Sequence, residues 1–192
     1  MYSVQQIARD ILHYWFTQPY LTFFQQSEQH DDILRNKFGK YFNMSGLYHL
    51  PWDTNARTFL CYILILDQFP RHFYRGTARA YACDPLAVSF LLKHYKRFLH
   101  QLTSTQKLFA LLPLQHSEHL GHQQLGCRII IKLLDKHPRD KVLQDMLHHQ
   151  RGHYRVIKVY GRFPKRNQFI ETRKNTKKET LYLATADPKL PY

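Results

Sequence analysis

Two short segments bring together residue types that could bind an anion or transfer a proton. The first follows eight consecutive apolar residues and contains Asp67, Gln68, Arg71 and Arg75. A buried carboxylate is normally paired, and the planar fork of arginine matches both of its oxygens. Asp67 and Arg71 therefore form either an internal clasp that closes a helix, or part of a pocket in which Arg71 and Arg75 bind an anion.

The second segment places His116 and Glu118 on either side of Ser117. A histidine whose pKa lies near neutrality suits proton transfer, so His116 and Glu118 are candidates for a catalytic acid–base pair. The alternative is structural, because Ser117 can cap a following helix and Glu118 favours the helix dipole in its first turn. His119 and His122 continue the run, but three imidazoles at this spacing do not share one helix face, and we predict no metal site.

No motif for a cofactor or a catalytic serine accompanies these residues. The glycine-rich loops that bind nucleotides, GxGxxG and GxxxxGKS/T, do not occur in the sequence, and neither does the GxSxG turn of serine hydrolases. We therefore expect no cofactor.

Residues 151–178 form a strongly basic segment. It contains ten Lys and Arg and one Asp or Glu, a balance of +9, whereas the whole chain of 192 residues carries +14. Four aromatic residues interleave with these cations: Tyr154, Tyr160, Phe163 and Phe169. Cations beside aromatic rings suit a nucleic acid, whose phosphates meet the charges while its bases stack on the rings. The alternative is a solvated basic face that binds nothing.

The composition indicates a folded and largely helical protein. Apolar residues make up 44% of the chain and aromatic residues 15%, which excludes a disordered polycation. The low counts of glycine (7) and proline (9) argue against a turn-rich β-sandwich or barrel. The length suits a single domain spanning residues 1–192. The three cysteines are far apart and no signal sequence or membrane span is apparent, so we expect a reduced, cytoplasmic protein.

Apolar spacing, capping residues and prolines predict seven or eight helices. The first opens with a capping box at Ser3 and ends before Pro19. A third helix over 53–68, apolar all round, is expected to be buried and to end at Pro70, because proline disfavours helical geometry in the residue before it. Pro113 is expected in a turn. The other helices are expected near residues 28–42, 84–100, 117–135 and 138–160, with a short last one opened by a capping box at 176–179.

Several motifs occur in an order and at a spacing that resemble one bacterial family. They are LDQFPR at 66–71, RGT at 75–77, DPLA at 84–87, PLQHSE at 113–118 and GRFP at 161–164, followed by Arg166 and Asn167. Over nearly its whole length the chain resembles the "domain of unknown function 924" family. The resemblance implies an all-helical, tetratricopeptide-like right-handed superhelix, and it implies no activity.

The chain departs from the pattern of that family at four positions. His72, Arg155, Val159 and Lys165 stand where the family usually has Asn, Asp, Arg and His, respectively. These departures remove an acid and add cations. Arg155 and Lys165 lie in the basic segment, so we treat the basic face as separate from the polar residues of the family pattern.

We expect an interaction module with a polar pocket that binds an anionic group of a peptide, a protein or a small molecule. The two Phe-Pro turns, at Pro70 and Pro164, are expected to meet near His116. The pocket would be lined by Asp67, Gln68, Arg71, Arg75, His153, Arg162, Arg166 and Asn167.

Two alternatives stay open beside the interaction module. One is a small-molecule enzyme of hydrolase type, which would use His116 and Glu118 together with Arg71 and Arg162. The other is a nucleic-acid-binding protein, which would use the basic face of residues 151–178.

Overall fold

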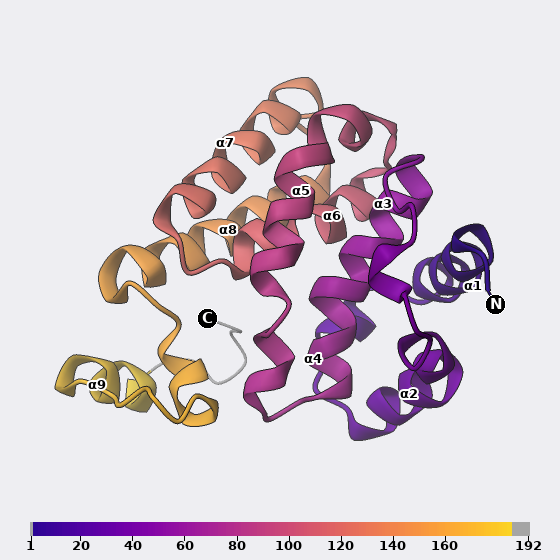
Figure 1. The fold of residues 1–192 in the computed structure, drawn as a ribbon. Coiled ribbons are helices and arrows are strands. Elements are labelled where there is room, and N and C mark those ends of the chain that lie inside the picture. Colours follow the sequence, from indigo (N-terminus) through magenta and orange to yellow (C-terminus); the bar gives the residue numbers. More distant parts are fainter. Residues whose placement is uncertain (1, 186–192) are drawn as a thin grey trace. The chain divides into compact units, whose positions relative to one another are not determined.

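The computed structural model describes residues 2–185, and within that range it contains α-helices, short 3₁₀ and π turns, and no β-strand. The all-helical fold class is therefore confirmed. Over the described range there are nine α-helices (Figure 1): α1 (Val4–Thr17), α2 (Glu28–Phe42), α3 (Ala56–Ile63), α4 (Phe69–Phe73), α5 (Asp84–Phe98), α6 (Ser104–His116), α7 (Leu120–Lys136), α8 (Lys141–Tyr160) and α9 (Lys177–Thr185).

The chain divides into two compact units. The N-terminal unit comprises the chain up to Arg75 together with Arg79–Ala110, and the C-terminal unit comprises Gly76–Ala78 and the chain from Leu111 onward. Helix α6 contributes residues to both units. A division into compact units does not decide whether they fold together, so the single domain stays a prediction.

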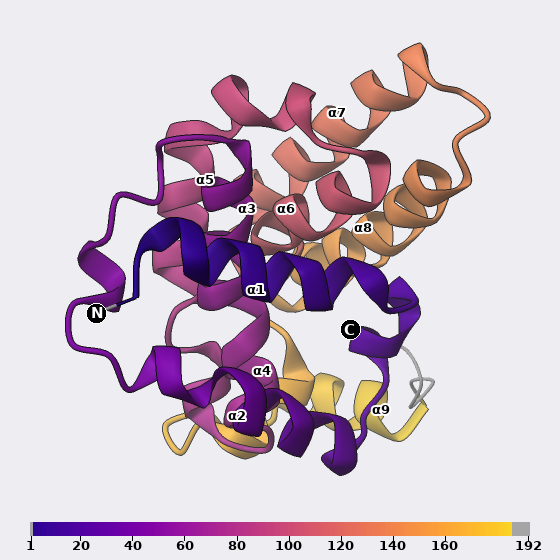
Figure 2. The same cartoon turned by 90° about the vertical axis from the view of Figure 1, so that its right-hand side faces the viewer.

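In the N-terminal unit, α1 follows directly from its sequence signals. The Ser3 hydroxyl oxygen accepts the backbone N–H of Gln6 at 3.2 Å and so caps the helix start. Only this half of the predicted capping box forms, because the Gln6 side chain donates to Asp10 at 2.9 Å instead. The face that carries Ile7, Ile11 and Trp15 is buried, and α1 packs against α3 (Figure 2). Helix α2 has the predicted bounds of residues 28–42.

The central helix of this unit is buried as predicted, but it does not end at Pro70. Every residue from Thr58 to Pro70 is buried. Between α3 and α4 the chain makes a π-helical turn over Leu64–Gln68, and the Phe69 backbone N–H donates to the Leu64 carbonyl five residues earlier. Pro70 has no N–H to donate, but it follows the π turn, where the regular pattern of helical hydrogen bonds is already interrupted. Phe69 keeps helical angles of φ −58° and ψ −40°.

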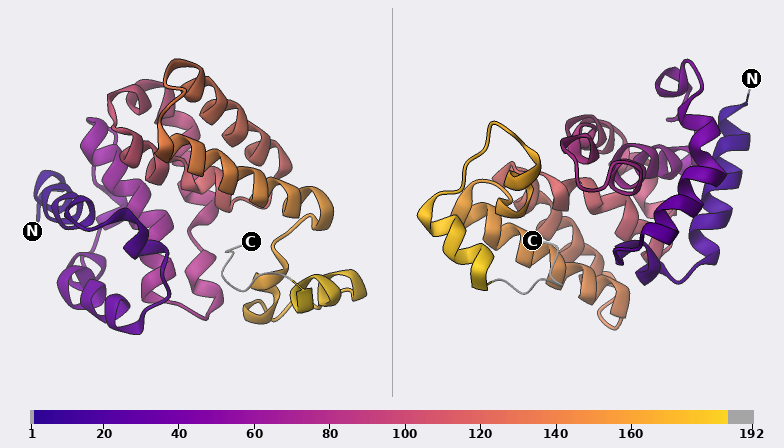
Figure 3. Two further views of the ribbon diagram at one scale, coloured as in Figure 1. Left: turned by 180° about the vertical axis from the view of Figure 1, so that it is seen from behind. Right: turned by 90° about the horizontal axis from the view of Figure 1, so that it is seen from below.

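In the C-terminal unit, α7 and α8 form an antiparallel hairpin joined by residues 137–140 (Figure 3). Gly126 of α7 lies so close to α8 that an added Cβ would stand 2.7 Å from the Gln150 side-chain oxygen. Helix α8 ends at Gly161, whose φ of 71° is the left-handed conformation that favours glycine. The expectation for Pro113 was wrong, because it lies inside α6 rather than in a turn.

Candidate functional site

The π turn of the N-terminal unit holds the first predicted cluster. Asp67 is fully buried, and the Gln68 amide nitrogen donates to its carboxylate at 2.6 Å. The Arg71 guanidinium donates to the Asp67 backbone carbonyl at 2.5 Å, and it meets both carboxylate oxygens of Asp84 at 2.9 and 3.0 Å. Burial disfavours the charged guanidinium, but the carboxylates of Asp67 and Asp84 raise the pKa of Arg71 above its ordinary value. This geometry favours the internal clasp over an anion-binding site.

Arg75 is engaged in a second ion pair of the same unit. Its guanidinium donates to both carboxylate oxygens of Asp31, at 2.5 and 2.8 Å. The His72 ring nitrogen Nδ1 lies 2.8 Å from the same carboxylate, to which we assign it as a donor because the carboxylate can only accept. Burial lowers the pKa of His72 to about 4, so its ring is neutral at pH 7. Asp31 gave no sequence signal, because a carboxylate in the first turn of a helix is common.

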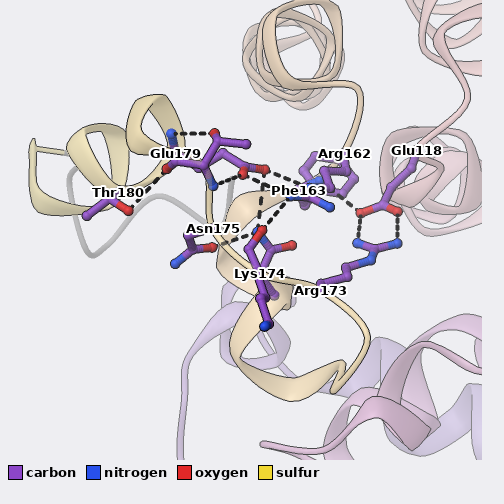
Figure 4. Close-up of polar contacts among 10 residues, drawn as sticks. Glu118, Arg162, Phe163, Arg173, Lys174, Asn175, Glu179 and Thr180 are labelled. Carbon is purple, nitrogen blue, oxygen red and sulfur yellow. Dashed lines mark hydrogen bonds and ion pairs between the residues drawn. The ribbon is translucent and has the colours of Figure 1, made fainter.

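In the C-terminal unit, Glu118 forms a clamp rather than a pair with His116 (Figure 4). Its carboxylate accepts two hydrogen bonds from the Arg173 guanidinium, at 2.8 and 2.6 Å, and one from the backbone N–H of Phe163 at 2.8 Å. Within the described residues it makes no hydrogen bond to His116. Burial raises the pKa of Glu118, but the hydrogen bonds from Arg173 and Phe163 outweigh it, and the net shift is downward. An ionised carboxylate of this kind is a poor general acid.

Arg162 likewise forms an ion pair, with Glu179 in the first turn of α9 (Figure 4). It donates to the buried carboxylate of Glu179 at 2.6 and 2.9 Å. Glu179 also accepts the Thr176 backbone N–H at 2.7 Å, and Thr176 Oγ1 accepts the Glu179 backbone N–H at 3.2 Å, which confirms the predicted capping box. The bond from Arg162 is the largest of the effects that hold the pKa of Glu179 far below its usual range. Asn167 donates to Asn175 Oδ1 at 2.7 Å beside this pair.

His153, His116 and Arg166 lie together in the C-terminal unit. The rings of His116 and His153 are 6.2 Å apart, and Arg166 donates to the His116 backbone carbonyl at 2.9 Å. His153 is buried, and its Nδ1 lies 3.0 Å from the backbone carbonyl of His149. Burial is the main reason why the pKa of His153 falls well below its ordinary value, with the nearby charge of His116 as the next cause. His153 is therefore a neutral, packed group.

Ser117 closes the turn between α6 and α7 instead of capping α7. Its hydroxyl oxygen accepts the His119 backbone N–H at 3.2 Å and lies 2.9 Å from His122 Nδ1. Helix α7 begins at Leu120, with His119 at its cap position. Gln123 ties this turn down, because its amide nitrogen donates to the carbonyl of Ser117 at 2.7 Å.

The predicted pocket residues fall into two groups. Asp67, Gln68, Arg71 and Arg75 lie in the N-terminal unit, and the other predicted site residues lie in the C-terminal unit: His116, Glu118, His153, Arg162, Arg166 and Asn167. A single pocket made from both groups stays a prediction. Three of the predicted site arginines already have a carboxylate partner within their own unit: Arg71, Arg75 and Arg162. Arg173, which was not among the predicted site residues, has one as well.

Most other cations of the basic segment differ from Arg162 and Arg173 in having no carboxylate partner among the described residues. Six of them are exposed and have no carboxylate partner within residues 2–185: Arg151, Arg155, Lys158, Lys174, Lys177 and Lys178. The first three stand at positions i, i+4 and i+7 of α8, so they share one face of that helix. We call Arg151, Arg155 and Lys158 the basic stripe.

Three further features of the described residues bear on metal binding, membrane insertion and disulfide formation. Residues 2–185 contain no group of three or more His, Cys, Asp or Glu side chains that could hold a metal ion. Over the same range, none of the helices has both the length and the apolar character needed to span a membrane. The three cysteines, at 61, 83 and 127, are free thiols.

Comparison with other proteins agrees with the motifs. A family model described as "Bacterial protein of unknown function (DUF924)" matches residues 11–187. The solved structure of the protein of unknown function ATU0120 from Agrobacterium tumefaciens is similar, with a TM-score of 0.81 and 30% sequence identity over 94% of this chain and 98% of that one. A search of curated proteins found no match. The chain therefore belongs to the bacterial family of proteins of unknown function DUF924.

Proposed function

We propose that the chain is a binding module for an acidic macromolecule, and that the basic stripe on α8 makes the contact. The main evidence is that Arg151, Arg155 and Lys158 are exposed on one helix face without any carboxylate partner among the described residues. Like charges spaced along one face repel one another in the free protein, and an acidic partner relieves that repulsion.

The engaged arginines support this proposal over the anion pocket. A carboxylate of the chain already occupies the guanidinium of Arg71, Arg75 and Arg162. A ligand would have to displace that carboxylate from its ion pair, which is unfavourable. A ligand that binds the basic stripe displaces no carboxylate of the chain.

Helix α7 carries a comparable set of cations and supplies the control. Arg128, Lys132 and Lys136 are exposed, but Asp135 lies among them and reduces their field. The basic stripe has no acid on its own face and belongs to the same segment as Lys174, Lys177 and Lys178.

Heparin, a sulfated polyanion, serves as the test probe. We expect the parent protein to bind heparin with an affinity that falls steeply as salt is raised. R151E/R155E/K158E should lose this binding, whereas R128E/K132E/K136E, with the same change in net charge, should keep most of it. Circular dichroism of both variants checks that they fold. Binding that neither variant weakens would contradict the proposal.

We also infer that the protein works in the cytoplasm, as the free thiols support. Chains in oxidising compartments tend to form disulfides, whereas three unpaired cysteines are typical of a reducing one. Fractionation of the bacterial source, followed by immunodetection, tests this location. Recovery in the periplasmic fraction would contradict it.

A further inference from the structure

We infer that the acidic partner is single-stranded nucleic acid, whose phosphates lie on the basic stripe and one of whose bases stacks on Tyr154. This inference rests on the proposed function and names the partner of the same surface. Two features of α8 support it: the spacing of its cations and the position of Tyr154 beside them.

The basic stripe is a short, straight row of charge. With a rise of 1.5 Å per residue, Arg151 and Lys158 are about 10 Å apart along the axis of α8, and Arg155 lies between them. At about 100° per residue the three side chains leave the helix within an arc of about 60°. A partner must therefore present several anions in a row, which a phosphodiester backbone does at every nucleotide.

Tyr154 flanks this row and supplies an aromatic surface. It is half-buried on α8, one turn before Lys158, and the ammonium of Lys158 lies 6.0 Å from the centre of its ring. An unpaired base can stack on such a ring while its phosphate meets the neighbouring cation, and this arrangement is typical of single-strand binding. A base inside a duplex is already stacked between its neighbours, so Tyr154 favours a single strand.

The cations of the basic stripe suit phosphate, but arginine forks bind carboxylates equally well, so the choice of a nucleic acid over an acidic polypeptide depends on Tyr154. Two of the three, Arg151 and Arg155, are arginines, whose planar forks donate two parallel hydrogen bonds to one phosphate. Exposed lysines at 174, 177 and 178 add positive charge to the same unit.

The test measures fluorescence anisotropy of the full chain with a labelled, mixed-sequence single-stranded DNA of about 20 nucleotides, longer than a typical single-strand site. The duplex of the same sequence and poly-glutamate are the competing probes. The variants are R151E/R155E/K158E, the matched control R128E/K132E/K136E, Y154L, and Y154F, which keeps the ring.

We expect the single strand to bind more tightly than either competing probe. Reversal of the basic stripe should reduce the slope of log affinity against log salt by about two, since each lost phosphate contact contributes about 0.7. Reversal on α7 should leave that slope close to the parent value. Y154L should weaken single-strand binding about fivefold or more, and Y154F should not.

Two results would overturn the inference in distinguishable ways. If poly-glutamate or the duplex binds as tightly as the single strand, or if Y154L binds like the parent, the partner is not single-stranded nucleic acid, and the proposed function stands. If no polyanion, heparin included, binds in a salt-sensitive way, both the inference and the proposed function fail.

Discussion

At the scale of single residues, the polar groups of this protein mostly fasten distant parts of each unit. Glu118 binds Arg173 across 55 residues of sequence, and Asp31 binds Arg75 across 44. Arg162 and Glu179 do the same at the start of α9. These pairs explain why charged residues that look catalytic in the sequence are packed and neutralised in the fold.

The clamp at Glu118 predicts a loss of stability when its charge is removed. E118Q leaves the Arg173 guanidinium beside a neutral amide, so the free energy of unfolding should fall by about 1–3 kcal/mol. Urea denaturation at pH 7 measures this change. E171Q is the control, because Glu171 is exposed and has no cation partner within residues 2–185, and it should change stability little. Equal stability of E118Q and the parent would show that Glu118 is not a clamp.

The burial of His153 predicts how stability depends on pH. Its folded-state pKa lies well below the unfolded value of about 6.5, so the unfolded chain binds the proton more readily. The contribution of neutral His153 to the free energy of unfolding is complete above pH 6.5. It is lost as the pH falls below that value, by up to about 1.4 kcal/mol per pH unit. Urea denaturation between pH 7.5 and 5 should therefore give a shallower decline for H153Q than for the parent. Parallel curves would refute this assignment.

Residue types indicated where charged groups would be paired or capped, but most of the partners did not follow from the sequence. The clasp at Asp67 and Arg71 followed from a carboxylate next to an apolar run, and the Thr176–Glu179 capping box from a local pattern. The partners Asp31 and Asp84 did not follow, because an ion pair between helices depends on how the helices pack. Sequence spacing carries no information of that kind.

At the scale of elements, most helices could be placed from the sequence because caps and apolar periodicity agree. Helix α6 (Ser104–His116) was not predicted, and the other two failures involve proline. Pro70 continues a helix because a π turn precedes it, and Pro113 lies within α6. Local rules penalise proline inside a helix by about 3 kcal/mol, and the burial of the surrounding apolar residues outweighs that cost.

The contact between α7 and α8 predicts that a side chain at position 126 lowers the stability of the protein. In G126A the new methyl group would stand 2.7 Å from the side chain of Gln150, which is itself buried and hydrogen-bonded to Gln123. Stability should fall by about 1–3 kcal/mol. G39A is the matched control, because Gly39 is in a helix with no atom within 4 Å of the added methyl, and alanine there should stabilise by about 0.5–1 kcal/mol. Thermal unfolding of both variants tests whether G126A lowers the stability and G39A raises it.

At the scale of the whole molecule, the expected single domain predicts one cooperative unfolding transition. Calorimetric and van't Hoff enthalpies should then agree. Differential scanning calorimetry of the full chain gives both. Two separable transitions would mean that the two compact units unfold independently, and the single-domain prediction would be wrong.

The fold also shows where the positive charge of residues 151–178 lies. Of the ten cations at 151–178, Arg162 and Arg173 are neutralised by the carboxylates of Glu179 and Glu118. Six of the others are exposed and have no carboxylate partner within residues 2–185, and half of these six form the basic stripe. Composition alone predicted a basic face, but only the fold separates the cations that brace the C-terminal unit from those that can meet a partner.

The most direct test of the central claim is the ratio of two heparin dissociation constants at one low salt concentration. We predict that R151E/R155E/K158E binds heparin at least about tenfold more weakly than R128E/K132E/K136E, although both variants carry the same net charge. Equal dissociation constants would show that net charge alone governs binding, and would contradict a binding site on α8.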